Sequence, residues 1–393
     1  MASFVDQFAL NLRQGAPTLK RALSAEAISI QERNLKAALL RNWHSLPTLE
    51  AHPLPTIFAV DGSSAIRHLN NGWSVIIAQA LAVGPEYEEP LVDVRFVRSS
   101  LSDDSLFRLS GLLMRSLELK VALTAALNAR GGLLCLDGSL QTGIPHCLYP
   151  LDIPGERDLP LSVLETYLDL VKTCQERGIM LIALSKTSTA SFFVEALVHM
   201  ASAKQLETDV DLSSDPDRQA LLSDAEVIFR WTSDPGYSTP LMLGVHGLGH
   251  RRAQLLQRPE AIATAFEGSK HLAPSLCLAL LRRLQDSPAT LAFHLRLRAG
   301  EESLRVDIPA SLLGLPYTLS DFYLHWGTAG DALPALAPIL ASHGGPTVYH
   351  AAAYVADRLV RLTNRMVDGP YLAIMRQNLG QYIQYNRSQR RFS

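Results

Sequence analysis

The sequence predicts an α/β protein in which a mixed central sheet is flanked by helices, with further helical segments at both ends of the chain. Apolar runs of strand length alternate with longer stretches whose apolar residues recur at helical spacing. The 393 residues are 47% hydrophobic and 19% charged, which supplies a large core and excludes a disordered chain. Two of the apolar runs end in the same three residues, Asp-Gly-Ser.

The first half of the chain predicts a strand meander, a long helix and two more strands. Residues 1–50 have helical spacing, and Pro53 and Pro55 end that pattern because proline disfavours helix before it. The elements that follow are expected, in order, as strands at 56–60, 73–84 and 91–98, a helix at 104–130, a strand at 133–137, a helix at 160–177 and a strand at 179–184.

The second half is more interrupted. Residues 203–225 are acidic and polar, which predicts a solvated loop or insertion. Strand-like runs follow at 226–232, 240–245, 290–297 and 303–308, helical patterns at 257–267 and 274–286, and a mostly helical segment from 348 to about 385. We therefore expect an N-terminal helical segment at 1–50, a main domain at 51–370, and a C-terminal helix with a basic tail at 371–393.

Composition narrows the class of protein. A net charge of −2 does not indicate a strongly basic nucleic-acid-binding surface, although a local basic groove would suffice. The four cysteines form no C-x-x-C pair, which argues against a zinc ribbon and fits a reducing compartment. There is no signal-peptide pattern, and no apolar stretch reaches the about 18 residues of a membrane span. We expect a cytoplasmic protein without a membrane segment.

The two Asp-Gly-Ser segments carry Asp61 and Asp137. If each strand ends there, with glycine turning the backbone away, both carboxylates lie at the edge of a sheet where α/β proteins build their sites. Mg²⁺ and Mn²⁺ prefer oxygen ligands of this kind, so the pair predicts a metal site. The alternative is an ordinary Asp-Gly turn in each copy.

Glu118 is a third candidate ligand. Its neighbours on the same face of the predicted helix are apolar, and an unpaired buried carboxylate is costly. It either pairs with Arg115, one turn back, or faces a metal held by Asp61 and Asp137.

Three further residues could take part in chemistry. Lys186 follows a strand and could offset phosphate charge, or it is a surface lysine. Tyr349 and Asp357 lie eight residues apart in a predicted helix, on roughly the same side, and Asp357 could instead pair with Arg361.

The His246-Gly-Leu-Gly-His250 segment has metal-ligand spacing, but its two glycines and the missing glutamate argue against a zinc site.

The order of these residues resembles a known family. An Asp strand, a meander, an acidic helix and a second Asp strand, in this order, are similar to the layout of ribonuclease H-like nucleases. With the later segments, the chain resembles the NurA nuclease family, the DNA-end-processing partner of the HerA hexameric translocase. The resemblance rests on Ala59-Val-Asp61-Gly-Ser-Ser64, Glu118, Leu136-Asp137-Gly-Ser139, Ser185-Lys-Thr-Ser188, Gly236-Tyr-Ser-Thr-Pro240 and the segment from Tyr349 to Asp357.

The resemblance implies a ribonuclease H-like core, a homodimer, and manganese-dependent cleavage of DNA as a 5′–3′ exonuclease and single-strand endonuclease, with Mg²⁺ as the alternative ion. Residue matching makes Asp61, Glu118 and Asp137 the metal carboxylates and Tyr349 the family's C-terminal tyrosine. Asp357 stands where the family often has histidine, so it would be a further ligand, or His350 would have taken over proton transfer.

These residues and the resemblance lead to two hypotheses about function, one for an enzyme and one for a protein without catalytic activity. The first is a metal-dependent DNA nuclease that uses Asp61, Glu118, Asp137 and Lys186, with Tyr349 orienting the substrate or a water. The second is a non-catalytic adaptor subunit that docks on a HerA-like ATPase. The intact set of acidic residues favours the enzyme.

Overall fold

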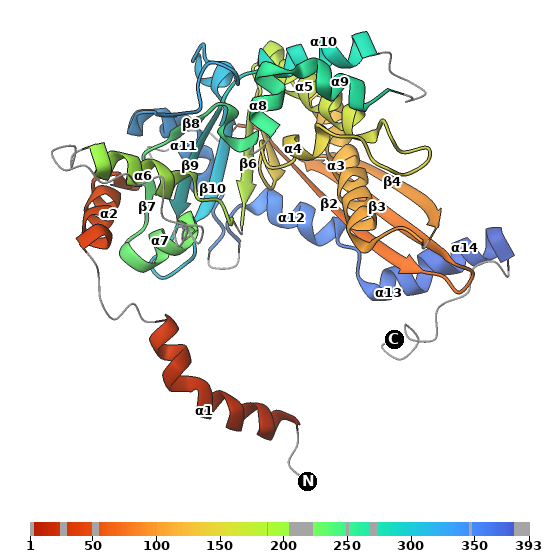
Figure 1. Ribbon diagram of the computed structural model, residues 1–393, viewed down its shortest axis with the longest axis horizontal. Helices are drawn as coiled ribbons and strands as arrows, with labels where there is room; N and C mark the ends of the chain where they lie inside the picture. Colours follow the sequence, from red (N-terminus) through yellow and green to blue (C-terminus); the bar gives the residue numbers. More distant parts are fainter. Residues whose placement is uncertain are drawn as a thin grey trace.

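The structure is a computed structural model, and it describes residues 4–23, 30–48, 55–98, 100–186, 188–203, 223–248, 251–267, 274–345 and 348–380. In this part of the chain the strands form one large mixed sheet with helices on both faces (Figure 1). The strands are β1 (Trp43–Ser45), β2 (Ile57–His68), β3 (Trp73–Gly84), β4 (Tyr87–Arg98), β5 (Leu133–Asp137), β6 (Met180–Ser185), β7 (Gly236–Ser238), β8 (Leu241–Leu243), β9 (Thr290–Arg296), β10 (Leu304–Pro309) and β11 (Leu324–Trp326).

The helices of the described residues range from single turns to one of 26 residues. They are α1 (Phe4–Leu23), α2 (Ile30–Arg41), α3 (Asp103–Asn128), α4 (Ile144–Cys147), α5 (Leu159–Arg177), α6 (Phe192–Ala203), α7 (Asp224–Trp231), α8 (Arg251–Gln257), α9 (Pro259–Ala265), α10 (Pro274–Gln285), α11 (Leu333–Ala341), α12 (Ala351–Val360), α13 (Asn364–Met366) and α14 (Leu372–Leu379). None of these helices has the length and apolar character that crossing a lipid bilayer requires.

The strand order along the sheet is β1-β7-β9-β10-β6-β5-β2-β3-β4, and β8 joins β9 to β11. Strands β2, β3 and β4 form the predicted antiparallel meander, whereas β2, β5 and β6 run parallel to one another. Val60 pairs in register with Leu136, so the residues that follow them, Asp61 and Asp137, lie side by side.

Strand alternation divides the core into two layers. Val60 and Leu136 point to one face and pack in the cluster that contains the apolar residues of α3 and α5. Ala59 and Cys135 point to the other face, where they pack with Ala353 and other residues of α11 and α12. By the same alternation, the side chains of Asp61 and Asp137 belong to the α12 face.

The C-terminal region is bound tightly to the meander. The Leu362 amide donates to Ser63 Oγ at 3.0 Å across 299 residues of sequence, and Gln79 Nε2 donates to the carbonyl of Val360 at 2.6 Å. These bonds place α12 against β2 and β3.

Several predicted elements are confirmed and others are wrong. The meander, the long helix and the strands at 133–137, 179–184, 290–297 and 303–308 are present with small shifts of their ends. The run at 226–232 is not a strand but helix α7, capped by the Ser223 hydroxyl, which accepts from the Glu226 amide. The last helical segment starts only at Ala351, because His350 Nδ1 caps it by accepting from the Ala353 amide.

Two further differences concern the ends of the chain. The segment 1–50 includes strand β1, which pairs with β7 and joins the sheet. The acidic residues Asp209, Asp211, Asp215 and Asp217 and the basic tail of Arg387, Arg390 and Arg391 lie outside the described residues. The division into three regions remains a prediction.

Candidate active site

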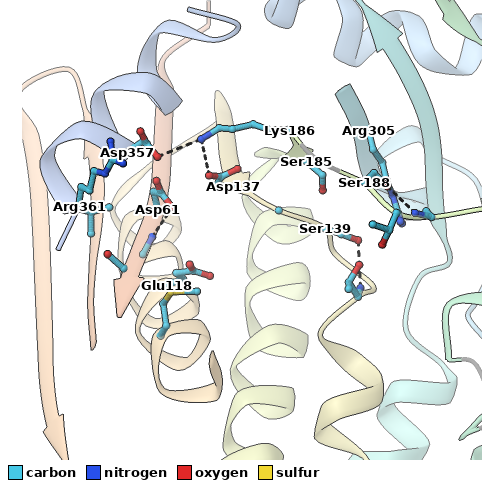
Figure 2. Close-up of a pocket in the computed structure, with 18 residues that line it drawn as sticks. Asp61, Glu118, Asp137, Ser139, Ser185, Lys186, Ser188, Arg305, Asp357 and Arg361 are labelled. Atoms are coloured by element: carbon cyan, nitrogen blue, oxygen red, sulfur yellow. Dashed lines mark hydrogen bonds and ion pairs between the residues drawn. The ribbon is translucent and has the colours of Figure 1, made fainter. Parts of the chain in front are cut away.

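A pocket of about 630 Å³ opens where β5 and β6 end beside the middle of β2 (Figure 2). Carboxylates line one half of the pocket. Serine hydroxyls and Arg305 line the other half. All of the predicted catalytic residues except Tyr349 line this pocket, namely Asp61, Glu118, Asp137, Lys186 and Asp357.

Asp61 does not stand at a strand end. Strand β2 continues through Asp-Gly-Ser to His68, so the expected turn at Gly62 is wrong. The carboxylate is 7% exposed and accepts from the Gly62 amide at 2.8 Å. Burial, and then the charge of Asp137, raise the pKa of Asp61 to about 7, although the Gly62 hydrogen bond opposes the shift. Without a cation, Asp61 therefore holds a proton over much of the acidic range.

Asp137 is the last residue of β5, so the predicted strand end at Asp137 is confirmed. Gly138 follows at φ +99°, a backbone conformation that favours glycine. The Asp137 carboxylate accepts from Lys186 Nζ at 3.0 Å. The strand end thus presents a charged oxygen at the pocket wall.

Asp357 completes a compact acidic group. Single carboxylate oxygens of Asp61, Asp137 and Asp357 all lie within 4.8 Å of one another. Asp357 comes from α12 and pairs with Lys186 Nζ at 3.4 Å, and not with Arg361, the competing partner considered from the sequence. Lys186 therefore bridges two of the three carboxylates, as Figure 2 shows.

Glu118 reaches the same pocket from the opposite face of the sheet. It lies on α3, is 6% exposed, and forms the alternative ion pair with Arg115 at 3.0 Å. Burial raises its pKa although Arg115 acts to lower it. Glu118 can come this near to the sheet because Gly62 has no side chain. A Cβ on Gly62 would lie 2.5 Å from Glu118 Oε1 and 2.8 Å from Met114 Cγ.

Replacing Gly62 with alanine should therefore destabilise the protein by about 1–3 kcal/mol, because the new methyl group overfills the space between β2 and α3. Urea unfolding measures the change. Gly111→Ala is the matched control: Gly111 lies within α3 and a Cβ there meets nothing within 4 Å, so alanine should stabilise by roughly 0.5–1 kcal/mol. Equal effects from both substitutions would contradict this packing.

The same site gives a test of the role of Glu118. If Glu118 contributes to a cation site, Glu118→Gln should weaken Mn²⁺ binding several-fold in calorimetry, whereas Arg115→Ala should leave the affinity unchanged or raise it, since it removes a competing cation. If the pair is only structural, both substitutions should lower the melting temperature alike and leave Mn²⁺ binding as it is.

Lys186 and Tyr349 lie together at the rim of the site. The ammonium of Lys186 is 5.1 Å from the centroid of the Tyr349 ring. Burial alone would lower the pKa of Lys186, but the charge and hydrogen bond of Asp137 outweigh it and raise the pKa, so the side chain stays a cation. Tyr349 precedes α12, so the predicted placement of Tyr349 and Asp357 on one helix is wrong.

Two histidine segments stay outside the pocket. His350 is wholly buried, its Nδ1 caps α12, and burial lowers its pKa to about 4. His246 Nε2 lies 2.8 Å from a carboxylate oxygen of Glu195, and His250 is outside the described residues.

Sequence reasoning missed Arg305 in the other half of the pocket, and it named Ser185 without giving that residue a role. Arg305 stands in β10, directly opposite Ser185 of β6 in the strand register. The signal was available: Arg305 and Asp307 interrupt an otherwise apolar strand, and buried charges need partners.

The carboxylate half of the pocket suits a hard divalent cation. Four carboxylates, Asp61, Glu118, Asp137 and Asp357, line this half of the pocket. Among the described residues Lys186 pairs with Asp137 and Asp357, and Arg115 pairs with Glu118, whereas Arg361 lines the pocket without a described ion pair to any of the four. Hard cations such as Mg²⁺ and Mn²⁺ take oxygen ligands. Burial, and then the charge of Asp137, raise the pKa of Asp61, and a bound cation would offset both effects by stabilising the ionised carboxylate.

Comparison with known proteins finds one matching family model and several solved structures with a similar fold. The family model described as the NurA domain matches residues 55–358. The crystal structure of the NurA nuclease from Sulfolobus solfataricus superposes with a TM-score of 0.54 at 16% sequence identity, over 98% of this chain and 100% of that one. A NurA structure bound to dAMP and manganese gives 0.52 at 12% identity, over 92% and 96% of the two chains. No curated protein matches the chain.

Proposed function

The chain belongs to the NurA family, and we propose that it is a metal-dependent deoxyribonuclease that hydrolyses phosphodiester bonds. The observation that carries the proposal is the acidic group of Asp61, Asp137 and Asp357, whose oxygens lie within 4.8 Å of one another in an open pocket. The presence of dAMP and manganese together in one structure of the family supports a nucleotide substrate and a manganese cofactor.

Mn²⁺ is the proposed cofactor, with Mg²⁺ as the alternative. Asp61, Asp137 and Asp357 would hold it, and Glu118 would add a fourth carboxylate from the α3 face. A bound ion of this kind lowers the pKa of water and offsets phosphate charge. Lys186, already a cation between two of the carboxylates, would stabilise charge on the phosphate, and Tyr349 would orient the substrate beside it.

We also assign the core to the ribonuclease H-like class. The order β4-β3-β2-β5-β6, with an antiparallel meander followed by two parallel strands, supports this assignment, as does the placing of the two aspartates on β2 and β5.

The finer activity follows from the family resemblance. We propose 5′–3′ exonuclease and single-strand endonuclease action by a homodimer in the cytoplasm, with a HerA-like hexameric ATPase as partner. The sequence has no P-loop of its own, so movement along DNA would need a separate motor. Helix α1 is a candidate docking element, because Phe4, Val5 and Phe8 are 91%, 73% and 66% exposed and α1 lies apart from the sheet (Figure 1).

The deciding experiment is a cleavage assay on end-labelled single- and double-stranded DNA, with Mn²⁺, with Mg²⁺ and with neither. A nuclease releases nucleotides or short fragments only when a divalent ion is present. Absence of cleavage together with absence of Mn²⁺ binding in calorimetry would instead favour the adaptor function. Co-elution of a HerA-like ATPase with the full chain, but not with a chain lacking residues 1–12, would support α1 as the docking element.

A further inference from the structure

The half of the pocket away from the carboxylates is lined by donors of hydrogen bonds. Figure 2 shows Ser139, Ser185, Ser188 and Arg305 on this side, separate from the acidic group. A guanidinium cannot ligate a metal cation, and the acidic group already offers a set of ligands for one. This half of the pocket therefore needs its own explanation.

Arg305 is held in a fixed orientation. Its Nε and Nη2 donate to Asp307 at 2.7 and 3.0 Å, and its guanidinium carbon lies 4.8 Å from the centroid of the Phe192 ring. Asp307 is wholly buried and also accepts from Ser139 Oγ at 2.6 Å and from the Leu140 amide at 3.0 Å. With four donors, this carboxylate is saturated and fixes both the arginine and the turn after β5.

Two donors on this side have no protein acceptor among the described residues and face the open pocket. Arg305 is 6% exposed, yet its Nη1 makes no hydrogen bond to any residue that the structure describes. Ser185, its partner across the β6–β10 ladder, is 9% exposed, and its hydroxyl likewise bonds to none of the described side chains or carbonyls. Both residues line the pocket and neither donor atom is closed off from it, so both are available to a ligand.

A ligand with several acceptor oxygens fits this pair. An arginine that is fixed on one side offers its remaining N–H bonds to an oxyanion. The guanidinium matches both carboxylate and phosphate, and phosphate is the anion that the proposed DNA substrate carries. Strand β6 separates β10 from β5, so the backbones of Arg305 and Asp137 are two strand spacings apart, about 10 Å. The two donors therefore lie beside the acidic group without being part of it.

We propose that Arg305 and Ser185 form a second phosphate subsite, which binds a phosphate of the DNA strand next to the one that is cleaved. This inference rests on the proposed nuclease function. The phosphate is either an internal diester or the monoester at a 5′ end, and both present the same oxygens. In either case the subsite would fix the register of the strand relative to the acidic group.

Arg305→Gln tests the subsite by fluorescence anisotropy on labelled single-stranded DNA in metal-free buffer. The affinity should fall about tenfold, as expected for loss of a charge-assisted hydrogen bond. The dependence of log affinity on log salt should become shallower by up to about one unit. Arg305→Lys should recover part of the affinity. Arg283→Gln, the same charge change at an exposed arginine paired with Asp169 on α5, is the matched control and should bind as the unaltered protein does.

Binding to DNA with and without a 5′ phosphate shows which phosphate occupies the subsite. If Arg305→Gln removes a preference for 5′-phosphorylated over 5′-hydroxyl DNA, the subsite takes the terminal monoester, and an equal loss on both DNAs means an internal diester. If Arg305→Gln does not fold, Ser185→Ala, which breaks no described bond, should still weaken binding about threefold.

Unchanged affinity and salt dependence in a folded Arg305→Gln or Ser185→Ala variant would overturn the subsite, provided that the unaltered protein cleaves DNA. If the unaltered protein neither binds nor cleaves DNA, the proposed function itself has failed.

Discussion

Asp61→Asn is expected to abolish Mn²⁺-dependent cleavage while the protein stays folded. Asparagine has nearly the same shape but lacks the charge that a divalent ion needs, and Asp61 is one of the three residues whose oxygens lie within 4.8 Å of one another. Loss of several kcal/mol of metal-dependent stabilisation corresponds to about a thousandfold in rate. The measurement is turnover on end-labelled DNA, with thermal unfolding of the same sample as the control for folding.

The same substitution should change how stability depends on pH in metal-free protein. The pKa of Asp61 is raised from 3.8 to about 7, so between these values the folded state binds more protons than the unfolded state. The free energy of unfolding should therefore fall as pH rises from about 4 to about 7, by up to about 4 kcal/mol, and change little above that.

In Asp61→Asn this fall should be absent, which makes the metal-free variant more stable than the unaltered protein at neutral pH. Saturating Mn²⁺ should remove the difference, because binding requires the ionised carboxylate. Full cleavage by a folded Asp61→Asn protein would rule out Asp61 as a ligand.

The second large effect is expected at Asp357. Asp357→Asn should weaken Mn²⁺ binding by about a hundredfold in calorimetry, because it removes one of the three clustered carboxylates and one partner of Lys186. Arg361→Gln is the matched control, since Arg361 lines the same pocket and has no described pairing with Asp357. If Asp357→Asn binds Mn²⁺ normally while Glu118→Gln does not, the ligands are those matched from the sequence, Asp61, Glu118 and Asp137.

The sequence alone located most of the site residues but not their arrangement. Two apolar runs with the same ending predicted that Asp61 and Asp137 come together, and the parallel pairing of β2 with β5 places them side by side. What could not be foreseen is that β2 continues past Gly62 and that α12 covers the face to which both aspartates point. Because side chains alternate along a strand, Asp61 and Asp137 point toward α12, and Asp357 of α12 lies next to them. Glu118 lies on the opposite face of the sheet and reaches the pocket above Gly62.

The other wrong predictions of secondary structure have local causes in the sequence. The apolar run of Val227, Ile228 and Phe229 resembles a strand, but Ser223 followed by Glu226 is a helix-capping pattern that would have predicted α7. Strands β1, β7 and β11 have three residues each, too few for any period to be recognised. Such strands form because the sheet beside them offers unpaired backbone groups, which is information from tertiary structure.

The attachment of α12 to β2 has a consequence for biosynthesis. The contact between Leu362 and Ser63 spans 299 residues, so the ribosome has made most of the chain before the third aspartate can join the other two. Contacts so distant in sequence form late and slowly, because a long loop must close first. An unfinished or prematurely terminated chain would carry the strands with Asp61 and Asp137 but lack Asp357, and so would lack the complete acidic group.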